Sequence, residues 1–270
     1  MTGKRDNRQN VKRRKNTMKA RKIPFAILFI FAVLCAKAVT ARASEITVLS
    51  STGVKTVVLD LAPQFEKATG NKLNITFNAS NLLKKDVDAG SSFDVIILTP
   101  ALINELIKAG KVADGSATDI ARAGIGVAVK KGAPKPDISS VDAFKNALIN
   151  AKSIAFTTAG QSGLQFAKVI EQLGIADQVK AKGKTLPGGS AGELIIKGEA
   201  DMAIQLIPEL MAVPDIEVVG PFPKDIQSYV VLTAGVAVNA KDKAAAQALI
   251  KFLTAPSAIQ VIKANGMEPG

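Results

Sequence analysis

The chain has 270 residues, 47% of them hydrophobic, which is enough for one large domain or two ordinary ones. Its net charge of +12 is concentrated in residues 1–43, which hold twelve of the 35 basic and one of the 23 acidic residues; the remainder, at +1, is too neutral for nucleic-acid binding. The chain has no His or Trp, and its single cysteine, Cys35, lies in the leader, which excludes disulfides, thiol nucleophiles, Ser-His-Asp catalysis and Cys- or His-based metal sites from residues 44–270.

Residues 1–43 have the pattern of a secretory signal peptide. A basic segment ends at Lys22, the apolar run Ile23–Ala36 follows, and Ala41 and Ala43 form an A-x-A cleavage site before Ser44. The run is shorter than the roughly 20 residues that span a bilayer, which disfavours the alternative of an uncleaved anchor. Met18 is an alternative start to Met1. The pattern predicts an exported protein that begins at Ser44.

The first half of the remaining chain alternates strands and helices. Strands are expected at 46–50, 72–78 and 94–98, and helices at 53–69, 82–89 and 100–109, with glycines after each helix. On the first helix we expect Leu59, Ala62 and Phe65 to share the buried face, with a kink or late start caused by Pro63. This βαβαβα order predicts a parallel sheet with right-handed crossovers.

A long strand at 123–130 and a second long β-rich run at 228–238 enclose another α/β set. Within that set we expect strands at 153–156, 201–205 and 216–219, and helices at 141–150, 162–173 and 191–197; helices at 241–253 and 256–264 finish the chain. The chain is therefore predicted to leave a first lobe, build a second and return. The expected bounds are 44–127 plus 236–270 for the first lobe and 128–235 for the second.

Ligands of such sheets bind where strands lead into helices, because helix N-termini there present unpaired N–H groups. Four of these junctions are rich in Ser, Thr and Gly, which equally suits ordinary helix caps at any single junction. Their coincidence in both lobes favours a site for a small anion or polar ligand. They are 50–53, 79–81, 157–163 and 187–190.

Other motifs are weak. Neither phosphate-binding glycine pattern is present, and Gly124-x-Gly126 lies inside a predicted strand. Asp60, Glu66 and Asp94 are interpreted as surface charges or caps, and Arg122, just before the first long strand, as a surface residue.

The order of several short motifs resembles that of periplasmic molybdate-binding proteins, the substrate-binding components of ABC importers. The motifs that carry this resemblance are VLSST at 48–52, PxFEKATG at 63–70, FxAS at 77–80, DAGxxFDV at 88–95 and KGEAD at 197–201. The resemblance covers residues 45–270. It implies the type II two-lobed α/β fold, with a mainly parallel sheet and flanking helices in each lobe and two crossover strands.

The resemblance also implies an oxyanion held by hydroxyl and backbone N–H groups. Ser51 and Ser80 match the two first-lobe ligand serines, Ser162 one backbone donor, and Gly188 or Gly189 another. The tyrosine of the family's cleft falls near Gln205 or Leu206, so it is absent here, and the only tyrosine, Tyr229, lies on the return strand. The full set of expected ligand-binding residues is Ser51, Thr52, Ser80, Asn81, Thr158, Gln161, Ser162, Gly163, Gly188, Gly189 and Gln205.

These observations predict a monomeric periplasmic solute-binding protein without catalytic residues, metal or cofactor. It would deliver a small oxyanion of the molybdate kind to a membrane permease. The alternatives are a binding protein for a small organic carboxylate, and an enzyme or signalling adaptor on the same scaffold, because fold does not fix function.

Overall fold

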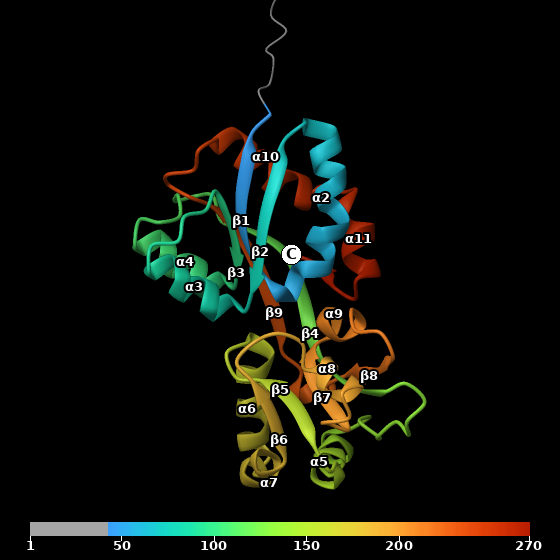
Figure 1. The fold of residues 1–270 in the computed structure, drawn as a ribbon. Helices are drawn as coiled ribbons and strands as arrows, with labels where there is room; N and C mark the ends of the chain where they lie inside the picture. Colours follow the sequence, from blue (N-terminus) through green and yellow to red (C-terminus); the bar gives the residue numbers. More distant parts are fainter. Residues whose placement is uncertain (1–42) are drawn as a thin grey trace, which may run out of the picture. The chain divides into compact units, whose positions relative to one another are not determined.

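The computed structural model describes residues 43–270, which form one compact unit. The predicted signal peptide, apart from its last residue, lies outside the described residues. Figure 1 shows two lobes built on a single curled sheet, whose strand order is β2-β1-β3-β9-β4-β7-β5-β6. The two-lobed α/β architecture agrees with the one expected from the sequence.

The first lobe contains a parallel set of three strands that an antiparallel strand extends. The strand β3 is buried along its whole length, as expected for an apolar strand with both faces covered. β9 runs antiparallel to β3 and also to the first half of β4, where β10 joins as a short edge strand. The bounds are β1 Glu45–Ser51, β2 Lys72–Asn78, β3 Val95–Leu98, β4 Thr118–Lys130, β9 Tyr229–Val236 and β10 Glu268–Pro269.

The second lobe is built on the other half of β4. There β7 and β8 pair antiparallel with β4, and β5 pairs parallel with both β7 and β6. The bounds are β5 Ile154–Thr157, β6 Gly183–Leu186, β7 Met202–Leu206 and β8 Ile216–Pro221.

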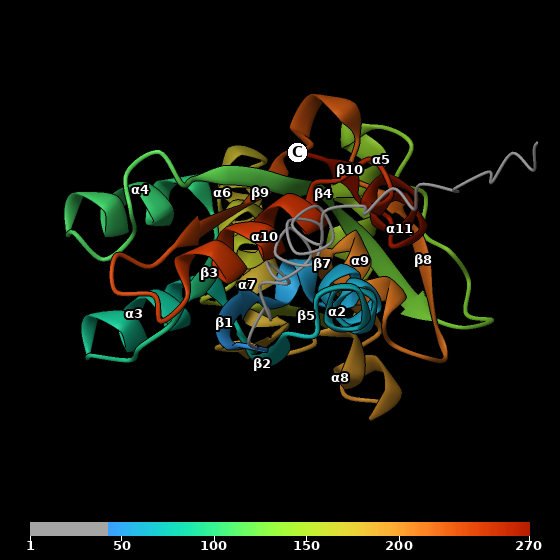
Figure 2. The same ribbon diagram turned by 90° about the horizontal axis from the view of Figure 1, so that it is seen from above.

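Helices cover both faces of this sheet. Figure 2 shows α3 and α4 on the side of the first lobe opposite α2 and α11. The final helices α10 and α11 both contact α2, so the end of the chain returns to the first lobe as expected. The bounds in chain order are η1 Thr52–Val54, α2 Lys55–Thr69, α3 Ser80–Asp88, α4 Pro100–Lys108, α5 Val141–Asn150, α6 Gln161–Gln172, α7 Ala176–Ala181, α8 Gly192–Ile196, α9 Ile207–Met211, η2 Lys224–Ile226, α10 Lys243–Leu253 and α11 Ala258–Ala264. Within residues 43–270, no single helix is long and apolar enough to span a membrane; only the pair α10 and α11, bent by 60°, reaches that length and composition together.

Three details of the sequence analysis were wrong. The buried face of α2 carries Val57, Val58, Leu61 and Phe65, whereas Leu59 is 48% exposed, because the i, i+4 stripe begins two residues earlier than expected. Asp94 is buried rather than on the surface: its carboxylate accepts the N–H groups of Thr47 (2.8 Å) and Lys241 (2.7 Å) and so connects the segment before α10 to β1. The elements α7, β6, α9 and β10 were not expected at all.

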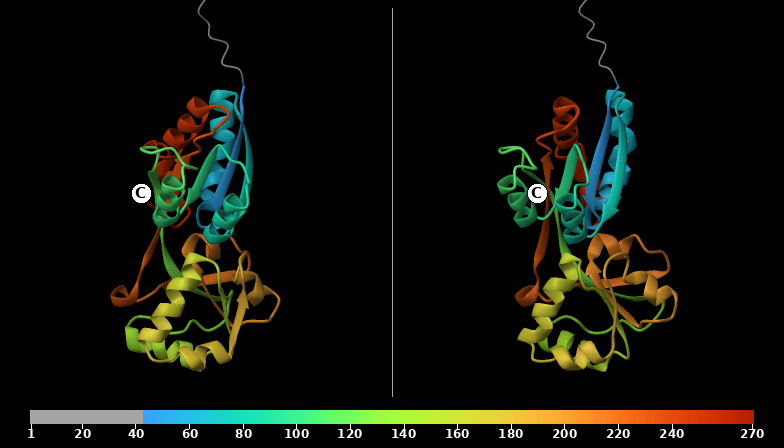
Figure 3. Two further views of the ribbon diagram at one scale, coloured as in Figure 1. Left: turned by 90° about the vertical axis from the view of Figure 1, so that its left-hand side faces the viewer. Right: turned by 60° about the vertical axis from the view of Figure 1, so that its left-hand side comes forward.

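The two lobes share β4, and its partners change at one point. β4 pairs with β9 up to Gly124 and with β7 from Ile125 onward. Gln227 bridges this change of partners, since its side chain accepts the N–H of Ile125 (3.1 Å) and donates to the carbonyl of Ile125 (2.9 Å). Figure 3 shows β4 and β9 passing between the lobes, so Gln227 stabilises the backbone on which any lobe movement depends.

We expect Gln227→Ala to lower the free energy of unfolding by about 1–2 kcal/mol, because the buried N–H of Ile125 loses its acceptor. Urea unfolding measures this loss. Gln64→Ala, at an exposed glutamine whose amide donates only to Asp60 within its own helix, is the matched control and should change stability by less than about 0.5 kcal/mol. Equal stability of both variants would show that the Gln227 bridge contributes nothing.

Candidate functional site

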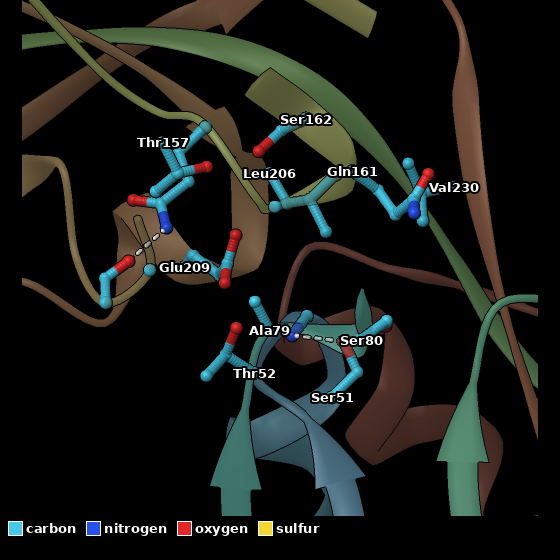
Figure 4. A pocket seen from close by; sticks show the side chains of 15 residues that line it. Ser51, Thr52, Ala79, Ser80, Thr157, Gln161, Ser162, Leu206, Glu209 and Val230 are labelled. Atoms are coloured by element: carbon cyan, nitrogen blue, oxygen red, sulfur yellow. Dashed lines mark hydrogen bonds between the residues drawn. The ribbon is translucent and has the colours of Figure 1, made fainter. Parts of the chain in front are cut away.

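A small cavity lies between the two lobes, where strands lead into helices. Ser51 ends β1, Ser80 begins α3, and Ser162 lies in the first turn of α6. The N–H groups in the first turn of a helix have no partner within the helix, so α3 and α6 both present donors here. Figure 4 shows the labelled side chains converging from both lobes.

The cavity is lined by buried hydroxyl groups. Ser51, Ser80, Thr157 and Ser162 are each exposed by 6% or less. The hydroxyl of Ser51 accepts the N–H of Gly53 (3.3 Å) and retains its own proton to donate. The Oγ1 atom of Thr157 is buried without a hydrogen-bond partner among the described residues. Because buried polar groups normally have partners, the hydroxyl of Thr157 is available to a group that enters the cavity.

The loop before α6 and the first turn of that helix need glycine for steric reasons. A Cβ atom at Gly163 would lie 1.6 Å from the carbonyl oxygen of Thr157, and one at Gly160 would lie 2.4 Å from its hydroxyl. The start of α6 therefore packs directly on the end of β5, which brings the donors of the helix to the cavity. Gly163 shapes the site without lining it.

Eight of the expected ligand-binding residues line this cavity, and three do not. The eight are Ser51, Thr52, Ser80, Gln161, Ser162, Gly188, Gly189 and Gln205. Besides Gly163, the residues outside it are Asn81 and Thr158. Asn81 donates across the lobes to the carbonyl of Ala159 (3.1 Å), and Thr158 is exposed with its hydroxyl near the carbonyl of Leu186 (3.4 Å). Asn81 thus holds the lobes together at the rim.

Gln205 is one of the two residues near the expected position of the family's tyrosine, and its side chain stabilises a loop of the site. Its amide donates to the carbonyl of Gly189 (2.8 Å) and accepts the N–H of Ala191 (2.8 Å). Tyr229 lies away from the cavity, 51% exposed, beside the guanidinium of Arg122. Arg122 lies within β4 rather than before it and also pairs with Glu268, which agrees with its interpretation as a surface residue.

The residue that sequence reasoning missed is Glu209, at the centre of α9. Its carboxyl group lines the cavity and interacts with the hydroxyl of Thr52, the N–H of Leu206 and the amide of Gln205. Burial raises the pKa of Glu209 from 4.5 to about 7, and these three hydrogen bonds oppose the rise. β7 leads directly into α9, so this junction is another place where a strand leads into a helix and ligands are expected. A prediction of α9 from the sequence would therefore have identified Glu209.

A second cavity of about 250 Å³ adjoins the first through a wall that contains Thr52, Gln205 and Glu209. The charged side chains of Lys55 and Glu193 line this second cavity. The first cavity is much smaller, about 20 Å³, which accommodates one compact group. Its described lining contains no lysine or arginine, and no group of three or more acidic, histidine or cysteine side chains in residues 43–270 is arranged to hold a metal ion.

Two lobes joined by shared strands, with a polar cavity between them, define a two-lobed ligand-binding protein. Residues 46–268 match the family described as bacterial extracellular solute-binding protein. The chain belongs to that family.

The chain is similar both to an enzyme and to ligand-binding proteins. An aconitate isomerase from a Pseudomonas species is 32% identical over 232 residues, covering 84% of this chain and 88% of that protein. The molybdate-binding protein ModA of Azotobacter vinelandii is 28% identical over 239 residues, covering 85% and 92%. The structure of the periplasmic molybdate-binding protein of Azotobacter vinelandii has a TM-score of 0.72 at 21% identity, covering 83% of this chain and 99% of that one.

These similarities confirm the resemblance to molybdate-binding proteins and the type II fold expected from it. The protein therefore has the fold of the substrate-binding components of ABC importers.

Proposed function

We propose that the protein captures a small oxyanion of the molybdate kind in the interlobe cavity and delivers it to an ABC permease. The observation that carries this proposal is the buried, unpartnered hydroxyl of Thr157, which faces the same cavity as Ser51, Ser80 and Ser162. Neutral O–H and N–H donors hold an oxyanion without a counter-charge, because helix N-termini already present partial positive charge.

The ligand would also control the arrangement of the lobes. Ser51 and Ser80 belong to the first lobe, and Thr157 and Ser162 to the second. An anion that accepts hydrogen bonds from both sides binds the closed arrangement better than an open one, and therefore favours closure. A closed lobe pair is the form that we expect the permease to recognise. We propose that the protein acts as a monomer in the periplasm, after cleavage before Ser44.

A small unsaturated carboxylate is the second candidate ligand, and isomerisation of that ligand is the second candidate function. Two observations favour it. The relative named aconitate isomerase is 32% identical over most of both chains, and Glu209 places a carboxyl group in the cavity where the molybdate-binding resemblance expects none. The adjoining cavity, with Lys55 on its wall, gives room for a ligand larger than one oxyanion.

A ligand screen separates the two candidates. We would measure thermal unfolding of residues 44–270 with molybdate, tungstate, sulfate, succinate and the two isomers of aconitate, since a ligand that binds only the folded protein raises the unfolding temperature. Stabilisation by molybdate but not by carboxylates supports the first candidate. Stabilisation by aconitate, with interconversion of its isomers in proton NMR spectra, supports the second. No stabilisation by any of them contradicts both.

Removing a single donor from the cavity is expected to weaken binding without unfolding the protein. Ser80→Ala should lower the affinity for the anion found in the screen by about 1–3 kcal/mol, because one ligand oxygen is left unpaired. Titration calorimetry measures this change.

Ser162 allows a matched pair of substitutions. Ser162→Ala removes only the hydroxyl, whereas Ser162→Pro also removes a backbone donor in the first turn of α6, where proline is tolerated. We therefore expect the proline variant to bind more weakly than the alanine variant. If Ser80→Ala and both Ser162 variants bind as the parent does, these serines are merely helix caps.

A further inference from the structure

Glu209 is the one titratable residue among those that line the interlobe cavity. Its side chain lies on the shared wall of both cavities, and Figure 4 shows it on the second-lobe side, opposite Thr52. An anion held by Ser51, Ser80, Thr157 and Ser162 would therefore share a small space with a carboxyl group. The protonation state of Glu209 then decides whether the two groups repel or form a hydrogen bond.

The immediate partners of Glu209 are neutral. Thr52 of η1, Gln205 and the N–H of Leu206 interact with its carboxyl group, and neither η1 nor β7 carries a charged residue. Lys55 of α2 and Glu193 of α8 line the adjoining cavity with opposite charges.

The other charged residues of the packed strands have partners elsewhere. In β4, Arg122 pairs with Glu268, Asp119 accepts from Thr233, and Lys130 is exposed at the end of the strand; in β8, Glu217 pairs with Lys135. None of the ion pairs within residues 43–270 involves Glu209, so no basic side chain neutralises its carboxylate in the cavity.

We propose that Glu209 binds the captured anion in its protonated form, donating a hydrogen bond to it, so that capture takes up a proton and weakens as the pH rises. This inference rests on the proposed function, because it concerns the anion in the same cavity. It names Glu209 as the residue that makes capture depend on pH.

The physical argument compares the two forms of the carboxyl group. Ionised Glu209 beside a bound anion would place two like charges within one small, poorly solvated space, which is strongly unfavourable. Protonated Glu209 instead supplies an O–H donor that the anion accepts. Because burial already brings the pKa of Glu209 to about 7, the proton is available at neutral pH. A bound anion raises this pKa further.

The expected pH dependence follows from this linkage. Below about pH 7 the affinity should be nearly constant, since Glu209 is already protonated before capture. Above pH 7 it should fall by up to tenfold for each pH unit, until the pKa of Glu209 in the complex is reached. The proton bound in the complex comes from the solvent.

Titration calorimetry with molybdate between about pH 6 and pH 9 tests this inference, because molybdate remains a dianion over that range. The parent protein should lose affinity above pH 7. Glu209→Gln keeps a hydrogen-bond donor but cannot ionise, so its affinity should not change with pH. Glu193→Gln removes the neighbouring carboxylate instead and should keep the slope of the parent. For the second candidate ligand, the affinity of the same three proteins for trans-aconitate is measured at pH 7.5 and above.

Proton uptake is measured by repeating the titrations in two buffers with different ionisation enthalpies. We expect uptake approaching one proton per anion above pH 7 for the parent and none for Glu209→Gln. Affinity that is independent of pH in the parent, or a slope that persists in Glu209→Gln, would overturn the inference and leave anion capture intact. Absence of binding by either anion to any variant at any pH would instead overturn the proposed function, and the inference with it.

Discussion

Gly163→Ala is expected to abolish anion binding and to lower the free energy of unfolding by about 3 kcal/mol or more. The added Cβ atom would lie 1.6 Å from the carbonyl oxygen of Thr157 and 2.7 Å from its carbonyl carbon, and both are backbone atoms of the buried strand β5. Ordinary overpacking costs about 1–3 kcal/mol where side chains can move, but here a strand or a helix has to move.

The consequence for binding follows from the same geometry. Relief of the overlap requires the start of α6 to move away from β5, which withdraws Ser162 and the first-turn N–H groups from the cavity. Urea unfolding and titration calorimetry of Gly163→Ala measure the two effects. Lys168→Ala, on the exposed face of α6, should leave both unchanged. Parent-like stability and affinity of Gly163→Ala would show that the contact between α6 and β5 is far looser than described.

Helices and strands with a clear periodicity of apolar residues were predicted from the sequence, and elements without that periodicity were not. The helix α9 has five residues, too short for a helical period to be recognised, and β6 carries two exposed residues in four. Because α9 was not predicted from the sequence, Glu209, which belongs to it, was not identified as a residue of the site. Partial burial at the cavity wall, rather than residue type, distinguishes Glu209 from the exposed glutamates, and this burial follows from tertiary packing that no local pattern encodes.

A shift of one residue explains the other error in the site. The strand β5 was expected at 153–156 and extends to Thr157, so the inward-facing threonine is Thr157 and not Thr158. Alternate residues of a strand face opposite sides, so an error of one position exchanges the buried hydroxyl for an exposed one. By contrast, Ser51, Ser80 and Ser162 do line the cavity, because the end of a strand and the start of a helix are marked by local residues.

Glu209→Gln is expected to stabilise the protein at alkaline pH and to leave its stability nearly unchanged at acidic pH. The folded protein raises the pKa of Glu209 from 4.5 to about 7, because burial disfavours the ionised form. A raised pKa contributes stability that is complete below about pH 4.5 and is lost as the pH rises through 7. At pH 8 the ionised carboxylate thus destabilises the folded parent. The pKa difference sets an upper limit of about 3 kcal/mol. Because solvent in the adjoining cavity screens the charge, we expect about 1–3 kcal/mol.

Glutamine has nearly the same shape and no charge, so it removes this cost while retaining a donor and an acceptor. Urea unfolding of the parent and Glu209→Gln at pH 5, 6, 7 and 8 should therefore give stabilities that are closest at pH 5 and separate progressively up to about pH 7. Glu199→Gln, at an exposed carboxylate, controls for the general loss of one negative charge and should show no such separation. A constant difference between parent and Glu209→Gln at all four pH values would mean that folding leaves the pKa of Glu209 unchanged, because the cavity is hydrated well enough to hold the ionised carboxylate.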